Sequence, residues 1–429
     1  MNQTYNHKLN SHSRNSRISA LLETLSYEKE YRIKVIPREN DANNHIHTTY
    51  SFSPYSPTAA AYEAYKSGLK TCGIMDHDTL GGAEEFSQAC KILNIGYTTG
   101  VEMRVKFKPG QWGRINHPDQ VDCAYVAAHG IPSQSIADFE SFMKPYRIER
   151  HTRNQHMINK INDLMKSYEI HLDYHQDVYM CSEAEHNGTI TERHIMNALA
   201  KKLEEKYGRT VELVNFLEHN MGYHLTPKQV TYLTDKDNGY FLFDLLGVLK
   251  TNTRFFYIDA DEEMPTVEQF IEVTKRLGGI PAYAYLGDVT QSITGDKAAQ
   301  AFEDRYLDQF VLELKRLGFE AIAYMPTRNT MEQLNRVKDL CEKYQLIQIS
   351  GEDINSPRQS FQCASLERPE FSHLIRTTWA LIGHERSIEK DFNKGLLSKE
   401  IITKYPDLDK RLAFFEYIGR TSIKNQTGE

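Results

Sequence analysis

The chain has 429 residues, of which 40% are hydrophobic and 25% are charged, with a formal net charge of −7. A chain of this length can bury a sizeable core, and it predicts two or three domains or one large barrel with insertions. The acidic balance leaves no basic footprint, so we expect no stable binding of duplex nucleic acid. A small anionic substrate stays compatible with this charge if a metal ion supplies local positive charge.

The six cysteines are scattered and form no C-x-x-C motif, which argues against a disulfide framework and a structural zinc knuckle. We therefore expect a reducing compartment. The polar N-terminus has no apolar signal region, and no run of about 18 apolar residues occurs. These features predict a cytoplasmic protein without a membrane partner, and they leave the oligomeric state open.

Residues 1–40 are predicted to form a polar, weakly ordered arm with one helix near 18–31. Over 41–134, short apolar segments typical of strands alternate with amphipathic segments typical of helices. We expect the strands to end near residues 47, 75, 105 and 128, and the helices to cover 57–67 and 82–93. This alternation predicts a largely parallel sheet or barrel.

The strand signal fades over 135–240, where charged stretches at 149–169 and 192–206 indicate an inserted helical subdomain. The alternation then resumes over 241–360. There we expect strands at 279–285, 319–324 and 346–350, and helices at 266–277, 299–317 and 331–344. The last segment, 361–429, is predicted to be a helical extension in which Trp379 has a packing role. The sequence thus favours an α/β barrel that a helical insert divides into two parts.

Two histidines, His45 and His47, lie in the first expected strand. Residues two apart in a strand point to the same face, so both imidazoles can face one cavity while Ile46 packs behind them. An isolated H-x-H also arises by chance in a chain with 17 histidines, where it would have no role in metal binding. The order of the other polar side chains favours the metal hypothesis.

Further candidate ligands accompany later strands, with His77 after the second, Glu102 near the end of the third and Asp353 after the last. In βα barrels the carboxyl ends of the strands carry the active site. Imidazole nitrogens and carboxylate oxygens suit Zn²⁺, Mn²⁺ or Fe²⁺, and a carboxylate such as Glu102 can bridge two ions so that a bound hydroxide attacks phosphorus. The pattern predicts a hydrolase with two or three metal ions.

These motifs resemble the PHP (polymerase and histidinol phosphatase) family in order, spacing and flanking residues. The resemblance covers about 42–360, and its segments are 45–51, 73–79, 99–103, 188–195, 278–285 and 350–355. It implies a distorted seven-stranded βα barrel with up to three metal ions. The layout most resembles the branch that hydrolyses nucleoside 3′,5′-bisphosphates and trims short RNA from its 5′ end.

Carried over to this chain, the resemblance implies metal-ligand and catalytic roles at matching positions. The implied metal ligands are His45, His47, His77, Glu102, His129, His194 and Asp353. Among them Glu102, His77 and Asp353 are also implied to be catalytic. The implied cofactors are one to three divalent ions, Mn²⁺ or Zn²⁺, with Fe²⁺ as an alternative. His129 and His194 stay open, since the local alignment at His129 is ambiguous and His194 in a polar helix could be a solvated surface side chain.

Three positions depart from the family pattern. Phe52 stands where the family has an Asp, Asn355 replaces a His, and Tyr285 takes the place of the His in an Ala-His-Pro strand end. Phe52 cannot ligate a metal, so at least one metal position is altered. Asn355 could ligate through its amide oxygen, and Asp288 could supply a carboxylate, although a turn cap is the favoured role for Asp288.

Other charged side chains are candidates for support and for substrate binding. Asp76 and Asp78 could orient the ring of His77 without touching metal. Substrate phosphate would need cationic groups near the metals, and our candidates are Arg153, Arg193 and Arg328. For Arg150 we favour a solvated helix face.

The leading hypothesis is a metal-dependent phosphoesterase that acts on a small phosphorylated substrate, a nucleotide or short oligonucleotide. One alternative is a catalytically reduced PHP barrel that binds a ligand or partner, because three site positions have changed. A second alternative is a histidinol-phosphatase-like enzyme, which the long helical insert favours less.

Overall fold

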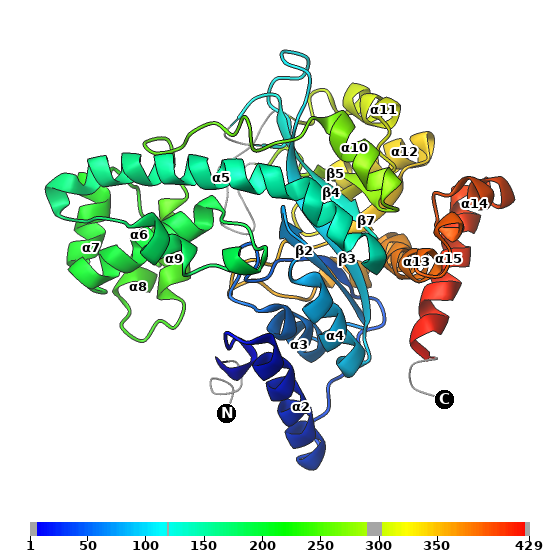
Figure 1. The fold of residues 1–429 in the computed structure, drawn as a ribbon, viewed down its shortest axis with the longest axis horizontal. Helices are drawn as coiled ribbons and strands as arrows, with labels where there is room; N and C mark the ends of the chain where they lie inside the picture. The colour runs from blue at the N-terminus through cyan, green and yellow to red at the C-terminus, as the bar shows by residue number, and fades with distance from the viewer. Residues whose placement is uncertain (1–6, 118–119, 290–302, 425–429) are drawn as a thin grey trace.

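The computed structural model describes residues 7–117, 120–289 and 303–424, and its centre is a seven-stranded sheet (Figure 1). The strands lie in the sheet in the order in which they occur in the chain. They are β1 (Asn43–Ile46), β2 (Thr71–His77), β3 (Gly96–Lys106), β4 (Cys123–His129), β5 (Ile280–Tyr285), β6 (Ala321–Tyr324) and β7 (Ile347–Ser350). Nearly every strand residue is buried, as expected for a sheet covered by helices on its outer face.

The sheet curls until its two edge strands meet. Beyond β7, Ile354 pairs with the end of β1: its backbone N–H donates to the carbonyl of His45 over 3.1 Å, and its carbonyl accepts from the N–H of His47 over 3.0 Å. The sheet is therefore a distorted barrel of the expected α/β class, and this pairing brings Asp353 beside the two histidines.

The direction of β4 differs from the parallel arrangement that strand–helix alternation predicts. β4 is antiparallel to both β3 and β5, while the other neighbouring pairs are parallel. The segment between β3 and β4 contains no helix in its described residues, so the chain returns as a hairpin rather than by a helical crossover. The carboxyl end of β4 consequently lies at the opposite end of the barrel from those of its neighbours.

Helices cover the outside of the barrel, and several begin where a side chain caps free backbone N–H groups. The covering helices that lie between two barrel strands in the sequence are α3 (Pro57–Lys66), α4 (Ala83–Leu93), α10 (Val267–Arg276), α11 (Leu307–Leu317) and α12 (Met331–Tyr344). Ser56, Thr266 and Thr330 accept hydrogen bonds from the first turns of α3, α10 and α12. The first residues of the helix predicted over 299–317 lie outside the described part of the chain.

The N-terminal segment forms a docked helix, α2 (Arg14–Glu30), rather than a weakly ordered arm. Arg17 on this helix is 3% exposed and donates through Nε to the Glu85 carboxylate of α4 over 2.8 Å. Glu85 also accepts from the backbone N–H of Thr58 at the start of α3. Composition alone does not reveal this order, because a buried ion pair between distant segments stabilises it.

The insert forms a second helical body beside the barrel with a hydrophobic core of its own (Figure 1). Its helices are α5 (Ile136–Met165), α6 (Glu192–Tyr207), α7 (Val211–Asn215), α8 (Pro227–Thr234) and α9 (Phe241–Leu249). α5, which has 30 residues, runs from the barrel into this body. The last helix of the insert, α9, ends nine residues beyond the predicted boundary at 240, and Phe256 still belongs to the core of the insert.

The C-terminal segment closes the barrel rather than extending from it. α13 (Ser372–Ile388) packs against β3 and β7 and is followed by α14 (Lys399–Lys404) and α15 (Leu408–Lys424). Trp379 is 7% exposed in the main core, and the Arg420 guanidinium lies 4.8 Å from the centre of its ring.

Short helical turns of the 3-10 or π type connect these elements. They are η1 (Ser133–Ser135), η2 (Lys166–Tyr168), η3 (Tyr174–Tyr179), η4 (Ala184–His186), η5 (Phe216–Asn220), η6 (Ala364–Glu367), η7 (Pro369–Phe371) and η8 (Phe392–Lys394). Within the described ranges, no helix combines the length and the apolar character that crossing a bilayer requires.

A buried carboxyl between α13 and β3 predicts how stability depends on pH. Glu385 is 2% exposed and accepts hydrogen bonds from the hydroxyl of Thr98 and, over 2.8 Å, from the backbone N–H of Thr99. Burial raises the pKa of Glu385 to about 8. The folded protein then keeps a proton that the unfolded chain releases near its ordinary pKa of about 4.3.

We therefore expect the contribution of Glu385 to stability to be fully present below about pH 4 and to be lost as the pH rises toward 8, by at most about 1.4 kcal/mol per pH unit. Denaturant unfolding between pH 5 and 8 measures this slope. Glu385→Gln, which keeps an acceptor oxygen, should show a flatter profile than the parent. Parallel profiles would contradict the prediction.

Candidate metal centre

Five predicted ligands converge at one end of the barrel, although they are spread over more than 300 residues of sequence. His45 and His47 come from the end of β1, His77 and Glu102 from adjacent positions of β2 and β3, and Asp353 from the segment after β7. The Oε2 atom of Glu102 lies 3.0 Å from His77 Nδ1 and 3.7 Å from His45 Nε2. The Nε2 atom of His47 lies 3.2 Å from Asp353 Oδ1.

These donors form two overlapping groups, His45 with His47 and Asp353, and His47 with His77 and Glu102. In each group the donor atoms lie within 4.8 Å of one another. Ligands of one ion with bonds of about 2.0 to 2.3 Å are separated by comparable distances. Because one imidazole nitrogen ligates one ion, His47 can serve only one group at a time. The residues therefore fit a divalent ion, with Glu102 placed to join both groups.

A hydrogen-bonded chain orients the ring of His47. The Nδ1 atom of His47 lies 3.1 Å from the hydroxyl of Ser51, which donates to Asp76 over 2.5 Å. Asp76 also accepts from the backbone N–H and the hydroxyl of Thr48. Because Nδ1 is engaged by Ser51, Nε2 is directed toward Asp353. A hydrogen bond to the other ring nitrogen commonly orients a metal-binding imidazole in this way. Asp76 thus supports His47 through Ser51, whereas we predicted that it orients His77.

Burial and charge prepare these groups for a cation. Burial, together with the neighbouring His77, lowers the pKa of His47, so its ring is neutral at neutral pH and its nitrogen can ligate. Burial opposes the charge on Glu102, but His77 and His45 outweigh it and hold the pKa of this carboxyl well below its usual range. The centre thus combines the neutral imidazole of His47 with the carboxylate of Glu102.

His129 faces the same cavity from a deeper level. It is 2% exposed, and neither ring nitrogen has a hydrogen-bond partner among the described residues. Glu102 lies opposite Ala127 in the antiparallel register, so His129, two residues further along β4, is on the same face but below the carboxylate. Burial lowers the pKa of His129 to about 3. A neutral, unpartnered imidazole directed into the cavity fits its predicted role as a ligand.

His194 does not join this cluster. Its Nδ1 accepts a hydrogen bond from the backbone N–H of Thr191 over 3.1 Å and thereby caps the start of α6. Its ring meets the edge of the Phe52 ring, with 5.0 Å between the ring centres. Phe52 also contacts Phe243 and belongs to the hydrophobic core of the insert. The position that holds an Asp in the family is here an apolar contact between barrel and insert.

The other two departures from the family pattern also have structural uses. Asn355 donates through Nδ2 to Asp353 over 2.5 Å, while its buried Oδ1 has no hydrogen-bond partner among the described residues. The hydroxyl of Tyr285 donates to Asp304 over 2.6 Å. Asp288 accepts from the backbone N–H groups of Glu303 and Asp304, which is the geometry of a turn cap, and it does not line the cavity.

A cavity of about 400 Å³ opens from the donor cluster. Arg193 and Arg328, two of the predicted substrate-binding residues, line it. Arg153 does not line it, because its guanidinium is 7% exposed and contacts Glu192 and Glu263. Arg150 is buried too, against Asp78 and Glu263, so our expectation of a solvated helix face for it is wrong.

Several cavity residues escaped sequence reasoning. They are Arg114, His117 and Tyr125 from the β3–β4 hairpin, and Lys250, Arg254 and Tyr257 from the segment after α9. Most of them lie outside regular helices and strands, where periodicity carries no information. The sequence did contain two signals for cations near the site. One is the pair of cations at the two ends of 250–254. The other is Arg104, which stands two residues after Glu102, so that both lie on one face of β3.

A curled, seven-stranded α/β barrel with imidazoles and carboxylates gathered at the ends of its strands defines a metal-dependent hydrolase as the class of protein. The PHP domain model matches residues 43–317. The chain belongs to the PHP family.

Comparison with individual proteins gives partial matches. A 5′-3′ exoribonuclease of Haemophilus influenzae is 36% identical over 64 residues, which span 15% of this chain and 23% of that relative. A Bifidobacterium adolescentis protein assigned provisionally as a metal-dependent phosphoesterase is 18% identical, with a TM-score of 0.49 over 77% of this chain and 96% of that one. An amidohydrolase from Chromobacterium violaceum is 17% identical, with a TM-score of 0.47 over 74% and 89% of the two chains.

The support of His47 by Ser51 yields a testable consequence. We expect Ser51→Ala to weaken Mn²⁺ or Zn²⁺ binding by about 10-fold to 100-fold, because loss of a supporting hydrogen bond leaves the ligand ring less well oriented. Metal titration followed by calorimetry or by equilibrium dialysis gives the Kd. Ser133→Ala, which removes an exposed hydroxyl that donates to Glu389 and not to a member of the donor cluster, is the matched control. Equal affinities for parent and Ser51→Ala would refute this role.

Proposed function

We propose that this hydrolase is a phosphoesterase that cleaves a phosphomonoester, with a nucleotide or the 5′ end of a short oligonucleotide as its substrate class. The observation that carries the proposal is the pairing of metal donors and cationic side chains in one cavity. Arg114, Arg193, Lys250, Arg254 and Arg328 line it together with the donor cluster. A phosphate group is the substrate feature that metal ions and guanidinium groups both bind well.

A divalent ion at these donors would lower the pKa of a coordinated water and polarise a phosphoryl oxygen. His45, His47 and Asp353 would hold it on one side, and Glu102 and His77 on the other. Arg193 and Arg328 face the same space, where they would neutralise negative charge on the phosphate.

Aromatic groups in the cavity support a nucleotide as the substrate. The rings of His117 and Tyr125 are stacked, with 5.0 Å between their centres and an interplanar angle of 18°. Tyr257 lines another part of the cavity. His117 is buried, whereas Tyr125 and Tyr257 are half-buried, and aromatic faces that reach a cavity stack with nucleobases with little dependence on base identity. The short match to a 5′-3′ exoribonuclease is consistent with this class.

The proposal predicts hydrolysis of phosphomonoesters by Mn²⁺-loaded protein. We expect activity on a panel of nucleoside monophosphates, nucleoside 3′,5′-bisphosphates and 5′-phosphorylated short RNA, and none on duplex DNA. Glu102→Gln should lower kcat/KM by about 1000-fold or more, since it removes a charged metal ligand worth several kcal/mol in the transition state. Phosphate release and chromatography of the products measure both effects.

Glu205→Gln on the exposed face of α6 is the matched control, and it should leave kcat/KM within about twofold of the parent. Inactivity of the parent on the whole panel, with activity gained by Phe52→Asp combined with Asn355→His, would instead identify a catalytically reduced barrel. Hydrolysis of histidinol phosphate alone would replace the nucleotide proposal with the other alternative.

A further inference from the structure

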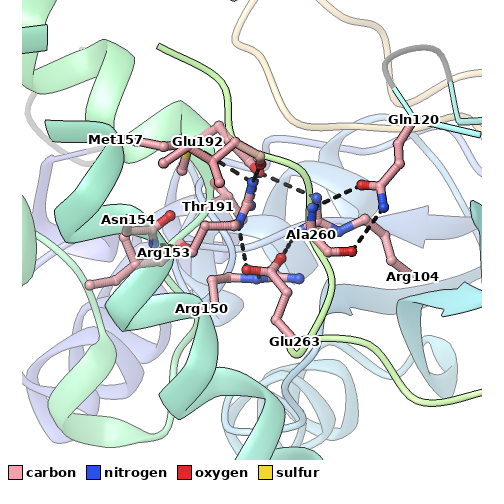
Figure 2. A network of polar contacts seen from close by, with 12 residues as sticks. Arg104, Gln120, Arg150, Arg153, Asn154, Met157, Thr191, Glu192, Ala260 and Glu263 are labelled. Carbon is pink, nitrogen blue, oxygen red and sulfur yellow. Dashed lines mark hydrogen bonds and ion pairs between the residues drawn. The ribbon is translucent and has the colours of Figure 1, made fainter. Parts of the chain in front are cut away.

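A buried carboxylate between barrel and insert contacts three arginines at once. Glu263 is 2% exposed, and its oxygens accept from Arg150 Nε over 3.1 Å, from Arg153 Nε over 2.5 Å and from Arg104 (Figure 2). Arg104 and Arg153 also contact Glu192. We call these five residues, Arg104, Arg150, Arg153, Glu192 and Glu263, the Glu263 cluster.

The Glu263 cluster joins elements that lie far apart in the sequence. Arg104 belongs to β3, Arg150 and Arg153 to α5, and Glu192 to the first turn of α6. Glu263 lies on the segment by which the chain returns from the insert to the barrel. Gln120 fixes this same segment through two hydrogen bonds to the backbone of Ala260, of 2.9 and 3.0 Å (Figure 2).

The cluster also reaches the donor side of the cavity. Arg150 donates to the Asp78 carboxylate, and Arg147 donates to the Asp78 carbonyl over 2.8 Å. Asp78 directly follows His77 and has a φ of 51°, in the left-handed region that Asp adopts more readily than most other non-glycine residues. Two arginines of α5 therefore hold the backbone turn next to a metal-ligand candidate.

Charge within this assembly is balanced. Arg104, Arg150 and Arg153 carry three positive charges, and Asp78, Glu192 and Glu263 carry three negative ones. Burial opposes ionisation of Glu263, but the three guanidinium groups outweigh it and lower its pKa. Arg104 and Arg150 also line the cavity, but their guanidinium groups are already committed to carboxylates and have little left to offer a substrate phosphate. The main effect of the cluster on the substrate is therefore through the wall that it holds.

We propose that the Glu263 cluster is a positioning device that holds the insert-derived wall of the cavity against the metal-donor face and so sets how tightly the enzyme binds substrates that reach this wall. That wall includes Glu192, Arg193, Lys250 and Arg254. Glu192 is a member of the cluster, and Arg193 follows it in the first turn of α6. The effect on substrates rests on the proposed phosphoesterase function, whereas the effect on the wall itself does not.

Hydrogen exchange measured by mass spectrometry tests the effect on the wall in the absence of turnover. Glu263→Gln keeps the shape of the side chain but leaves the buried arginines with an uncompensated charge. We expect backbone exchange over 189–196 and 250–263 to become about tenfold faster or more, with β1 and β2 unchanged. Glu205→Gln, on the exposed face of α6, is the control and should match the parent. Unchanged exchange in both segments, or uniform acceleration including the barrel strands, would overturn the proposal.

Kinetics test the effect on substrates. For Glu263→Gln we expect KM for a nucleoside phosphate to rise about tenfold with kcat within about threefold, because the displaced wall loses contacts that bind the ground state and the transition state alike. KM for p-nitrophenyl phosphate, which is too small to span the cavity and meets this wall only through its phosphate, should rise by about threefold at most. A parallel loss of kcat on both substrates would overturn the proposed selectivity.

A second variant guards against loss of folding. Arg153→Lys keeps the charge but loses the fork that contacts Glu263, Glu192 and the carbonyl of Ile258 together. It should reproduce the exchange pattern of Glu263→Gln with smaller amplitude, and parent-like exchange would count against the proposal. If the parent hydrolyses no substrate while the exchange pattern appears as expected, the phosphoesterase function fails and the positioning role of the cluster stands.

Discussion

The carboxylate of Glu102 is the group on which the arrangement of the centre depends. It is a buried negative charge on β3, and such a charge is costly unless cationic or donor groups surround it. His77 and His45 meet it from two neighbouring elements, and His47 lies 4.0 Å away. A cation at this point would complete the compensation. The curl of the sheet, the pairing of Ile354 with β1 and the support of His47 by Ser51 all serve to bring these groups within reach of one another.

A second buried charge system has a different use. The Glu263 cluster pairs its carboxylates with arginines and leaves no donor cluster for a metal, whereas the Glu102 site pairs carboxylates with imidazoles, which can release their protons and ligate. Arginine keeps its charge under all ordinary conditions, so it is suited to a permanent structural contact. The two adjoining sites thus differ in chemistry because imidazoles face the carboxylates in one and guanidinium groups face them in the other. The first is suited to a cation, and the second to a lasting contact between barrel and insert.

The three positions that depart from the family pattern are all occupied by side chains with contacts of their own. Phe52, with a φ of 80°, joins the core of the insert, Tyr285 bonds to Asp304, and Asn355 donates to Asp353. The contact of Phe52 strengthens the junction between barrel and insert, that of Asn355 holds the candidate ligand Asp353, and that of Tyr285 joins the end of β5 to the segment before α11. The metal centre consequently has fewer donor groups than the family pattern implies, while the cavity beside it is bounded by a firmly packed helical body. The cavity in this chain is therefore lined by residues of the insert as well as of the barrel.

The sequence by itself determined the class of fold, the order of most strands and helices, and the candidate ligands His45, His47, His77, Glu102 and Asp353, because local periodicity, strand-end spacing and family motifs are all carried by neighbouring residues. Only the tertiary structure decided the reversed direction of β4, which depends on pairing with two other strands. It also decided the surroundings of the side chains of Arg150, Arg153 and His194, since a charged or polar side chain has the same local pattern whether it faces water, a substrate or a buried partner. The docking of α2 and α13 likewise depends on the tertiary structure. Arg17 contacts Glu85, and Glu385 contacts Thr98, and in both pairs the partners lie too far apart in sequence for a local pattern to predict the contact.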